Sequence, residues 1–212
     1  MIKNIIFDVG KVLVEYDPVT FVKNRGYTKE EQEIVLNAIF RSSLWLAADR
    51  GPIETKKLIE GFAANAPGHE DLIRDAYGHA EETVWEMPYT MEWIRELKEK
   101  GYRLYVLSNY GKDLFERTRD KMPFLPYMDG AVFSHQCHLM KPEREIYQYL
   151  CDTYSLAPSE SVFLDDTEGN IAGARGYGIH GIWFQGYEEA KKRLETLLGL
   201  YDEEHSMVYC AE

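Results

Sequence analysis

Cysteine, positive charge and long apolar runs are all scarce in this sequence of 212 residues. The 3 cysteines, Cys137, Cys151 and Cys210, are odd in number and lack the paired spacing of a zinc site, so reduced thiols are expected. The 24 Lys and Arg residues against 36 Asp and Glu give a net charge of −12, which argues against nucleic acid and against an anionic membrane as general partners. No run approaches the roughly 18 apolar residues of a membrane span, and the first residues do not form a secretory leader. A cytoplasmic protein is therefore expected.

What is present begins with an apolar run that ends in a carboxylate. Ile5, Ile6 and Phe7 are apolar without alternation, which predicts a strand buried on both faces. Asp8 follows directly, at the carboxyl end of the strand, where parallel sheets place their ligands. Gly10 then permits a close approach of the backbone.

The rest of the chain falls into two parts of different pattern. Residues 17–84 carry helical periodicity and no convincing strand. From Pro88 onward, strands expected near 104–107, 131–133, 161–164 and 179–184 alternate with helices, one of them opened by Lys141-Pro142. Such alternation predicts an α/β fold, a Rossmann-like parallel sheet with right-handed crossovers. We expect a core made of residues 1–16 and 85–212, with residues 17–84 inserted as an α-helical cap.

Several polar side chains follow the predicted strands. Because the carboxyl ends of parallel strands share one edge, Asp8, Ser108 and the pair Asp165-Asp166 should converge there, with Lys141 nearby. Clustered carboxylates raise one another's pKa unless a cation is present, and Mg²⁺ commonly uses one or two carboxylates together with a phosphate. A hydroxyl and an ammonium are suited to hold a phosphoryl group.

In order and spacing, four segments resemble the motifs of the haloacid dehalogenase-like hydrolases, which are mostly Mg²⁺-dependent phosphatases. They are Phe7-Asp8-Val9-Gly10-Lys11-Val12, Leu107-Ser108-Asn109, Lys141-Pro142 and Leu164-Asp165-Asp166-Thr167-Glu168-Gly169-Asn170. The insertion after the first motif is similar to the helical cap of that family. The aspartate-x-glycine of the first motif, with Asp49-Arg50-Gly51 in the cap, resembles a subgroup that acts on sugar phosphates such as hexose 1-phosphates.

The resemblance implies that Asp8 attacks phosphorus and forms an aspartyl-phosphate. It also implies that Mg²⁺ is held by Asp8, by the backbone carbonyl of Gly10 and by Asp166. Asp165 would help directly or through water. Asn170 stands where some relatives carry another acid.

The resemblance also assigns the groups that bind the substrate. Ser108, the backbone N–H of Asn109 and Lys141 would bind the phosphoryl oxygens, and Lys141 would be the second catalytic residue beside the nucleophile. In the cap, Arg50 and Trp45 are candidates for substrate contact. A surface salt bridge explains Arg50 equally well, and packing inside the cap explains Trp45.

Gly10 departs from the family, because most of its phosphatases have a second aspartate there as general acid and base. Such help typically contributes roughly 10²–10⁴-fold. Three explanations remain open. The enzyme is slow, another residue such as Lys11, Tyr16 or Tyr110 donates the proton, or the leaving group needs little protonation, as in a sugar 1-phosphate.

The sequence therefore predicts a Mg²⁺-dependent phosphatase of a small phosphorylated metabolite, as a monomer or a homodimer. A 2-haloacid dehalogenase is one alternative, but it needs no metal, and the pair Asp165-Asp166 argues for one. A weakly active protein that binds a phosphorylated metabolite as a regulator is another. The residues from Gly176 to Gly181 match a dinucleotide-binding pattern, yet they follow a helix and lead into a strand, which predicts a turn.

Overall fold

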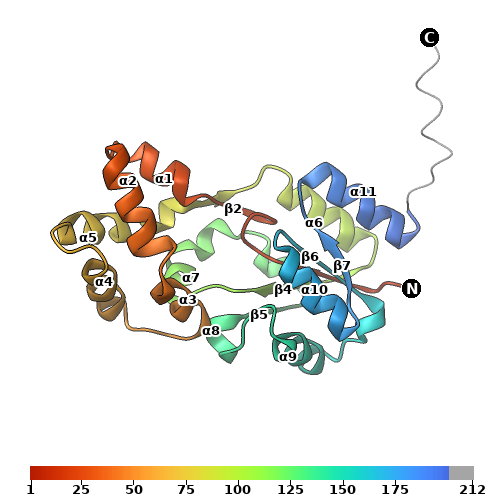
Figure 1. Ribbon diagram of the computed structural model, residues 1–212. Helices are drawn as coiled ribbons and strands as arrows, with labels where there is room; N and C mark the ends of the chain where they lie inside the picture. The colour runs from red at the N-terminus through yellow and green to blue at the C-terminus, as the bar shows by residue number, and fades with distance from the viewer. Residues whose placement is uncertain (201–212) are drawn as a thin grey trace, which may run out of the picture.

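A five-stranded parallel sheet forms the centre of the computed structural model, which describes residues 1–200 (Figure 1). Its strands are β1 (Asn4–Phe7), β4 (Arg103–Ser108), β5 (Gly130–Phe133), β6 (Ser161–Asp165) and β7 (His180–Trp183). They lie in the order β5-β4-β1-β6-β7, and every neighbouring pair is parallel. The predicted α/β fold with a parallel sheet is confirmed, and β1 occupies its centre.

Helices cover both faces of this sheet. On one face lie α6 (Thr90–Glu99), α7 (Lys112–Thr118) and α11 (Tyr187–Leu198), and on the other lie α9 (Arg144–Tyr154) and α10 (Glu168–Tyr177). Along β1, Ile5 and Phe7 pack in the first apolar cluster and Ile6 packs in the second. Burial on both faces explains why this run is apolar without alternation.

A second, antiparallel sheet pairs β2 (Val14–Tyr16) with β3 (Val84–Glu86), with Tyr16 opposite Val84. The sequence does not reveal either strand, because 3 residues are too short to display a period of two. Between these strands the chain makes only helices and turns. That residues 17–84 form a unit separate from the core stays a prediction.

The helices between β2 and β3 lie at one end of the molecule and share the apolar cluster of the α6 face (Figure 1). They are α1 (Pro18–Asn24), α2 (Lys29–Val35), the π-helical turn Leu36–Phe40, α3 (Ser43–Arg50), α4 (Thr55–Ala64), α5 (Glu70–Gly78) and the 3₁₀ turn Ala80–Thr83. The remaining short helices are Arg119–Lys121, Leu125–Tyr127, α8 (Ser134–Cys137) and Pro158–Glu160.

One predicted helix start is wrong. Lys141-Pro142 does not open α9, which begins at Arg144. Instead, Glu143 N–H donates to the Met140 carbonyl at 2.8 Å and closes a turn that contains Lys141. The turn predicted near Gly178 is present, because Gly178 ends α10 with φ +106° and leads into β7.

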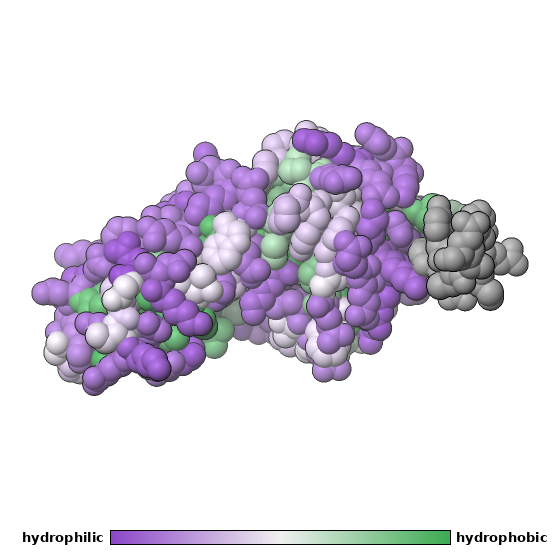
Figure 2. All heavy atoms as spheres, turned by 90° about the horizontal axis from the view of Figure 1, so that it is seen from above, coloured by the Kyte–Doolittle hydropathy of each residue, from purple (hydrophilic) through white to green (hydrophobic). Residues whose placement is uncertain are grey.

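The surface of the face in Figure 2 is mostly hydrophilic, with small and scattered apolar patches. Within residues 1–200, no helix combines the length and the apolar character needed to cross a membrane. Cys210 and the rest of the chain after residue 200 lie outside the described residues.

Trp93 on α6 offers a test of the packing around β1. Its side chain is 1% exposed, and its ring contacts those of Phe7 at 5.1 Å and Tyr187 at 5.3 Å. We expect Trp93→Ala to lower the free energy of unfolding by about 3–5 kcal/mol, measured by urea denaturation. Trp85→Ala on β3 is the matched control, since that side chain is 39% exposed, and its loss should not exceed about 1 kcal/mol. Equal losses would contradict this account of the core.

Candidate active site

Three carboxylates meet at the carboxyl edge of the parallel sheet. Asp8 follows β1, Asp165 ends β6, and Asp166 comes next in the chain. One oxygen from each of them lies within 4.8 Å of the others. Ser108, buried at the end of β4, reaches the same place, and its side chain hydrogen-bonds to Asp8.

Lys141 provides the positive charge among these groups. Its buried Nζ lies 2.8 Å from Asp8 Oδ1 and 2.6 Å from Asp165 Oδ2. Asn109 holds the lysine in place, because its side-chain amide donates to the Lys141 carbonyl at 3.0 Å and its Oδ1 accepts from Lys141 N–H at 2.9 Å. The end of β4 thereby positions the turn that carries Lys141.

The two neighbouring aspartates have different surroundings. Asp165 is fully buried and accepts from Lys141, from Thr167 N–H at 2.8 Å and from the Asn170 amide at 3.0 Å. Asp166 is half-buried and lines a cavity, with Lys11 Nζ 3.9 Å from its Oδ2. Asp165 therefore orders the protein groups around it, while Asp166 faces the space in which a ligand would bind.

The electrostatics of this cluster follow from burial. Burial raises the pKa of Asp8 from its ordinary value of 3.8 to about 6, Lys141 opposes this effect, and Asp165 adds to it. Burial and the charge of Asp165 also raise the pKa of Asp166. Burial alone would lower the pKa of Lys141, but Asp8 and Asp165 outweigh it and the pKa is raised. The buried ammonium of Lys141 and the more exposed one of Lys11 thus face three carboxyl groups, a balance that favours binding of a further cation.

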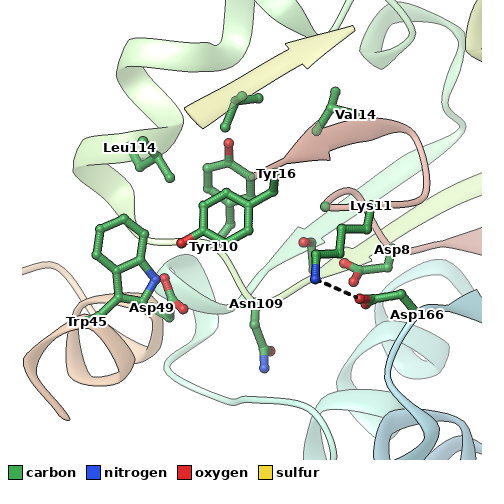
Figure 3. Close-up of a pocket in the computed structure, with 13 residues that line it drawn as sticks. Asp8, Lys11, Val14, Tyr16, Trp45, Asp49, Asn109, Tyr110, Leu114 and Asp166 are labelled. Atoms are coloured by element: carbon green, nitrogen blue, oxygen red, sulfur yellow. Dashed lines mark ion pairs between the residues drawn. The ribbon is translucent and has the colours of Figure 1, made fainter. Parts of the chain in front are cut away.

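Asp8 and Asp166 form the floor of a cavity of about 250 Å³ (Figure 3). Polar groups from the strand ends and their loops line one side: Asp8, Gly10, Lys11, Ser108, Asn109 and Asp166. Mostly apolar and aromatic groups line the other: Val14, Tyr16, Trp45, Asp49, Val84, Tyr110 and Leu114. Both strands of the small β2-β3 sheet therefore contribute to the wall.

The structure separates the two cap residues considered for substrate contact. Trp45 lines the cavity and also packs against the rings of Tyr16 at 6.3 Å and Phe40 at 5.0 Å. Arg50 is not among the cavity residues, because its guanidinium binds both carboxylate oxygens of Glu143. The proposed contact between Arg50 and the substrate is not supported by this geometry.

The three proton donors proposed from the sequence, Lys11, Tyr16 and Tyr110, have different surroundings. Thr118 Oγ1 donates to the Leu114 carbonyl, so the Tyr110 hydroxyl donates to Thr118 at 2.8 Å. Burial raises the pKa of Tyr16 and of Tyr110 far above the ordinary value of 10. Lys11 lies beside Asp166.

Asp49, near the end of α3, is the polar residue of the cavity lining to which the sequence assigned no role. Its side chain is half-buried opposite the carboxylate cluster (Figure 3). The Asp49-Arg50-Gly51 motif is visible in the sequence. The position of its carboxylate near the end of β1 cannot be predicted, because nothing in the local sequence of a helix indicates which distant strand it will face. The helical packing that brings it there comes from residues far away in the chain.

Comparisons with known proteins agree with this geometry. The chain is 26% identical over 182 residues to the sesquiterpene phosphatase astK of Aspergillus oryzae, which covers 85% of this chain and 88% of that protein. It is 25% identical over 183 residues to the D-ribitol-5-phosphate phosphatase of Bacteroides thetaiotaomicron, which covers 81% of this chain and 86% of that protein. It is 29% identical over 207 residues to mouse acyl-CoA dehydrogenase family member 10, but there the chain spans only 19% of the relative's length.

A solved structure shows the same fold. It is a HAD family enzyme from Bacteroides thetaiotaomicron in complex with magnesium and inorganic phosphate, with a TM-score of 0.69 and 22% identity over 89% of this chain and 98% of that chain. A family model described as haloacid dehalogenase-like hydrolase matches residues 2–178, and the phosphatases among the relatives support the predicted phosphatase. As the sequence predicted, the chain belongs to the haloacid dehalogenase-like hydrolases.

Proposed function

We propose that the protein is a Mg²⁺-dependent phosphatase that hydrolyses a small phosphorylated metabolite through an aspartyl-phosphate on Asp8. One observation carries the proposal. Asp8 and Asp166 come together at the floor of one cavity, at the end of the central strand, and the buried Lys141 forms an ion pair with Asp8. A carboxylate nucleophile, an ammonium and a further carboxylate are the groups that phosphoryl transfer to an aspartate requires.

The orientation of Asp8 suits a nucleophile. Its Oδ1 accepts from Val9 N–H at 2.7 Å and from Lys141, which holds the carboxylate in one direction. In the first step an Asp8 oxygen forms a bond to phosphorus, and the ester P–O bond breaks with its electron pair on the leaving oxygen, which takes a proton. In the second step water attacks phosphorus and releases phosphate and the Asp8 carboxylate. Ser108, Asn109 N–H and Lys141 would hold the phosphoryl oxygens through both steps.

The residues present fit Mg²⁺ by their chemistry. Carboxylate and carbonyl oxygens are the donors this hard cation takes, and Asp8, Asp166 and the Gly10 carbonyl would hold it. Asp165 would act through water, because Lys141, Thr167 and Asn170 already donate to its oxygens. When bound, Mg²⁺ would offset the negative charge of the carboxylates and of the phosphoryl group.

For the substrate we propose a sugar phosphate, of the hexose 1-phosphate type. A cavity of about 250 Å³ suits a small metabolite, and Trp45, Tyr16 and Tyr110 offer ring faces against which the C–H groups of a sugar can pack. A relative that acts on D-ribitol 5-phosphate and the aspartate-x-glycine of the first motif support the same class.

The first test is phosphate release from a panel of sugar phosphates and simple phosphomonoesters, with and without Mg²⁺. We expect release only with the metal, and a loss of at least about 10³-fold in Asp8→Asn, because the nucleophile is gone. Halide release from a 2-haloacid without metal would instead establish the dehalogenase alternative. Binding of a phosphate ester without turnover by the folded protein would favour the regulator.

Asp8→Asn should also make the metal-free protein more stable at pH 7.5. Because the pKa of folded Asp8 is raised from 3.8 to about 6, its ionised form costs the folded state up to about 3 kcal/mol above pH 6, and this cost disappears below the unfolded pKa. The amide is neutral at every pH. We expect a higher urea midpoint for the variant in EDTA at pH 7.5 and a smaller difference at pH 4.5. A variant less stable than the wild type at pH 7.5 would contradict this reading of the cluster.

Mg²⁺ itself should stabilise the folded wild type by mass action, by about 1–3 kcal/mol at 10 to 100 times its Kd. Thermal unfolding with increasing Mg²⁺ measures this effect without any substrate. Asp166→Asn should lose most of the stabilisation, while Asp71→Asn, the same exchange at an exposed position on α5, should keep it. An unchanged response in Asp166→Asn would remove Asp166 from the proposed metal site.

A further inference from the structure

The proposed reaction has an unassigned proton. An alkoxide leaving group must be protonated as the P–O bond breaks, and Gly10 stands where most relatives carry the acid. The backbone at Gly10 does not explain the glycine, because its φ lies outside the left-handed region and a β-carbon there would lie 3.8 Å from Tyr16 Cβ, an ordinary contact. The acid must therefore be sought among the other groups that line the cavity.

Asp49 faces the cavity from the side opposite Asp8 (Figure 3). The leaving oxygen departs on the side of the phosphorus away from the attacking carboxylate, because attacking and leaving oxygens are roughly in line. Asp166 lies within the carboxylate cluster, on the same side as Asp8. Among the carboxylates of residues 1–200 that line the cavity, Asp49 is the one on the opposite wall, where it is well placed to reach the leaving oxygen.

The residues Asp49, Arg50 and Gly51 contact the segment that carries Lys141. The Ser134 hydroxyl donates to the Asp49 carbonyl, and Arg50 binds Glu143. Gly51 lies so close to His138 that a β-carbon would be 2.8 Å from the ring nitrogen Nδ1. Three consecutive residues of α3 and its C-terminus are thus held by the turn around Lys141, which sets the cap acid in a defined place relative to the phosphoryl site.

The approach of Asp49 to the core depends on a second glycine. Gly111 N–H lies close enough to the Asp49 carboxyl group to lower its pKa, and a β-carbon on Gly111 would lie 3.2 Å from Asp49 Oδ1 and 3.3 Å from the Ala48 carbonyl. Both distances are shorter than ordinary contacts. A glycine at this position therefore allows α3 to pack closely against the loop after β4.

The surroundings of Asp49 favour its protonated form. Burial raises its pKa from 3.8 to about 7, Gly111 N–H opposes this, Asp8 adds to it, and Lys141 opposes it more weakly. A group with a pKa near the working pH is an efficient general acid and, once deprotonated, an efficient general base.

We propose that Asp49 is the catalytic acid and base of this enzyme. This proposal rests on the proposed phosphatase function. As the ester P–O bond breaks, the leaving oxygen takes the carboxyl proton of Asp49 and departs as an alcohol. The resulting Asp49 carboxylate then takes a proton from the attacking water, whose oxygen bonds to phosphorus and expels Asp8. The products are the alcohol and phosphate, and Asp49 is again protonated.

The test compares two esters in single turnovers with Mg²⁺. An alkyl phosphate needs a proton on its leaving oxygen, while p-nitrophenyl phosphate releases a stable anion. For Asp49→Asn we expect release of the alkyl alcohol to fall by about 10²–10⁴-fold, and release of p-nitrophenol to fall by less than about tenfold. Asp71→Asn, the same exchange on an exposed helix, should leave both rates unchanged.

Two further measurements distinguish proton transfer from a structural role. Gly10→Asp, placed in the Asp49→Asn protein, should restore alkyl ester cleavage at least tenfold, because it supplies a second acid. For the wild type, the rate with an alkyl ester should fall as the pH rises above about 7, and Asp49→Asn should lack this dependence. The charged and titratable groups that face Asp49 are Asp8, Lys141, Tyr16, Tyr77 and Tyr110, together with Lys112 and Asp113 at the start of α7.

Equal losses with both esters, without rescue by Gly10→Asp, would show that Asp49 only shapes the cavity and would overturn the proposal. So would an alkyl ester rate that Asp49→Asn leaves unchanged. A wild type that releases no phosphate from any ester would overturn the proposed function itself, and with it the role of Asp49. If the wild type is active and Asp49→Asn cleaves the alkyl ester at the same rate, only the assignment of Asp49 as the catalytic acid is overturned.

Discussion

The buried ammonium of Lys141 is the interaction on which the rest of the site depends. It lies within hydrogen-bond distance of Asp8 and Asp165, and so joins the ends of β1 and β6 through opposite charge. Without it, carboxylates from adjacent strands would face each other in a place from which water is largely excluded, at a cost of several kcal/mol. The turn around Met140 and Glu143 therefore stabilises the cluster by delivering a buried cation to it.

That turn also connects the site to the helical part of the molecule. The short segment from α8 to the start of α9 holds Lys141 toward the sheet and holds α3 through Ser134 and Glu143. The same few residues thus determine where the phosphoryl group would bind and where the opposite wall of the cavity stands.

Much of this arrangement could be predicted from the sequence, because the parallel strands are recognisable as short apolar runs and their ends carry Asp8, Ser108 and Asp165. What escaped prediction depends on weaker local signals. β2 and β3 are too short to show alternation, and the pairing of Tyr16 with Val84 joins residues distant in the chain. Likewise Asp49 and Arg50 are adjacent in sequence, yet one faces the cavity and the other binds Glu143, a choice made by packing and not by residue type.

The pairing of β2 with β3 has a consequence for how such a protein can change over time. Residues 17–83 begin directly after Tyr16 and end directly before Val84, and these two residues are direct neighbours in one small sheet. The entropy of closing a loop grows only slowly with its length, so the closure of the core depends little on what lies between two ends that already meet. The helical segment can therefore be lengthened, shortened or exchanged while the carboxylates and Lys141 stay in place. New substrate preferences can arise by replacing one wall of the cavity, without rebuilding the chemistry beneath it.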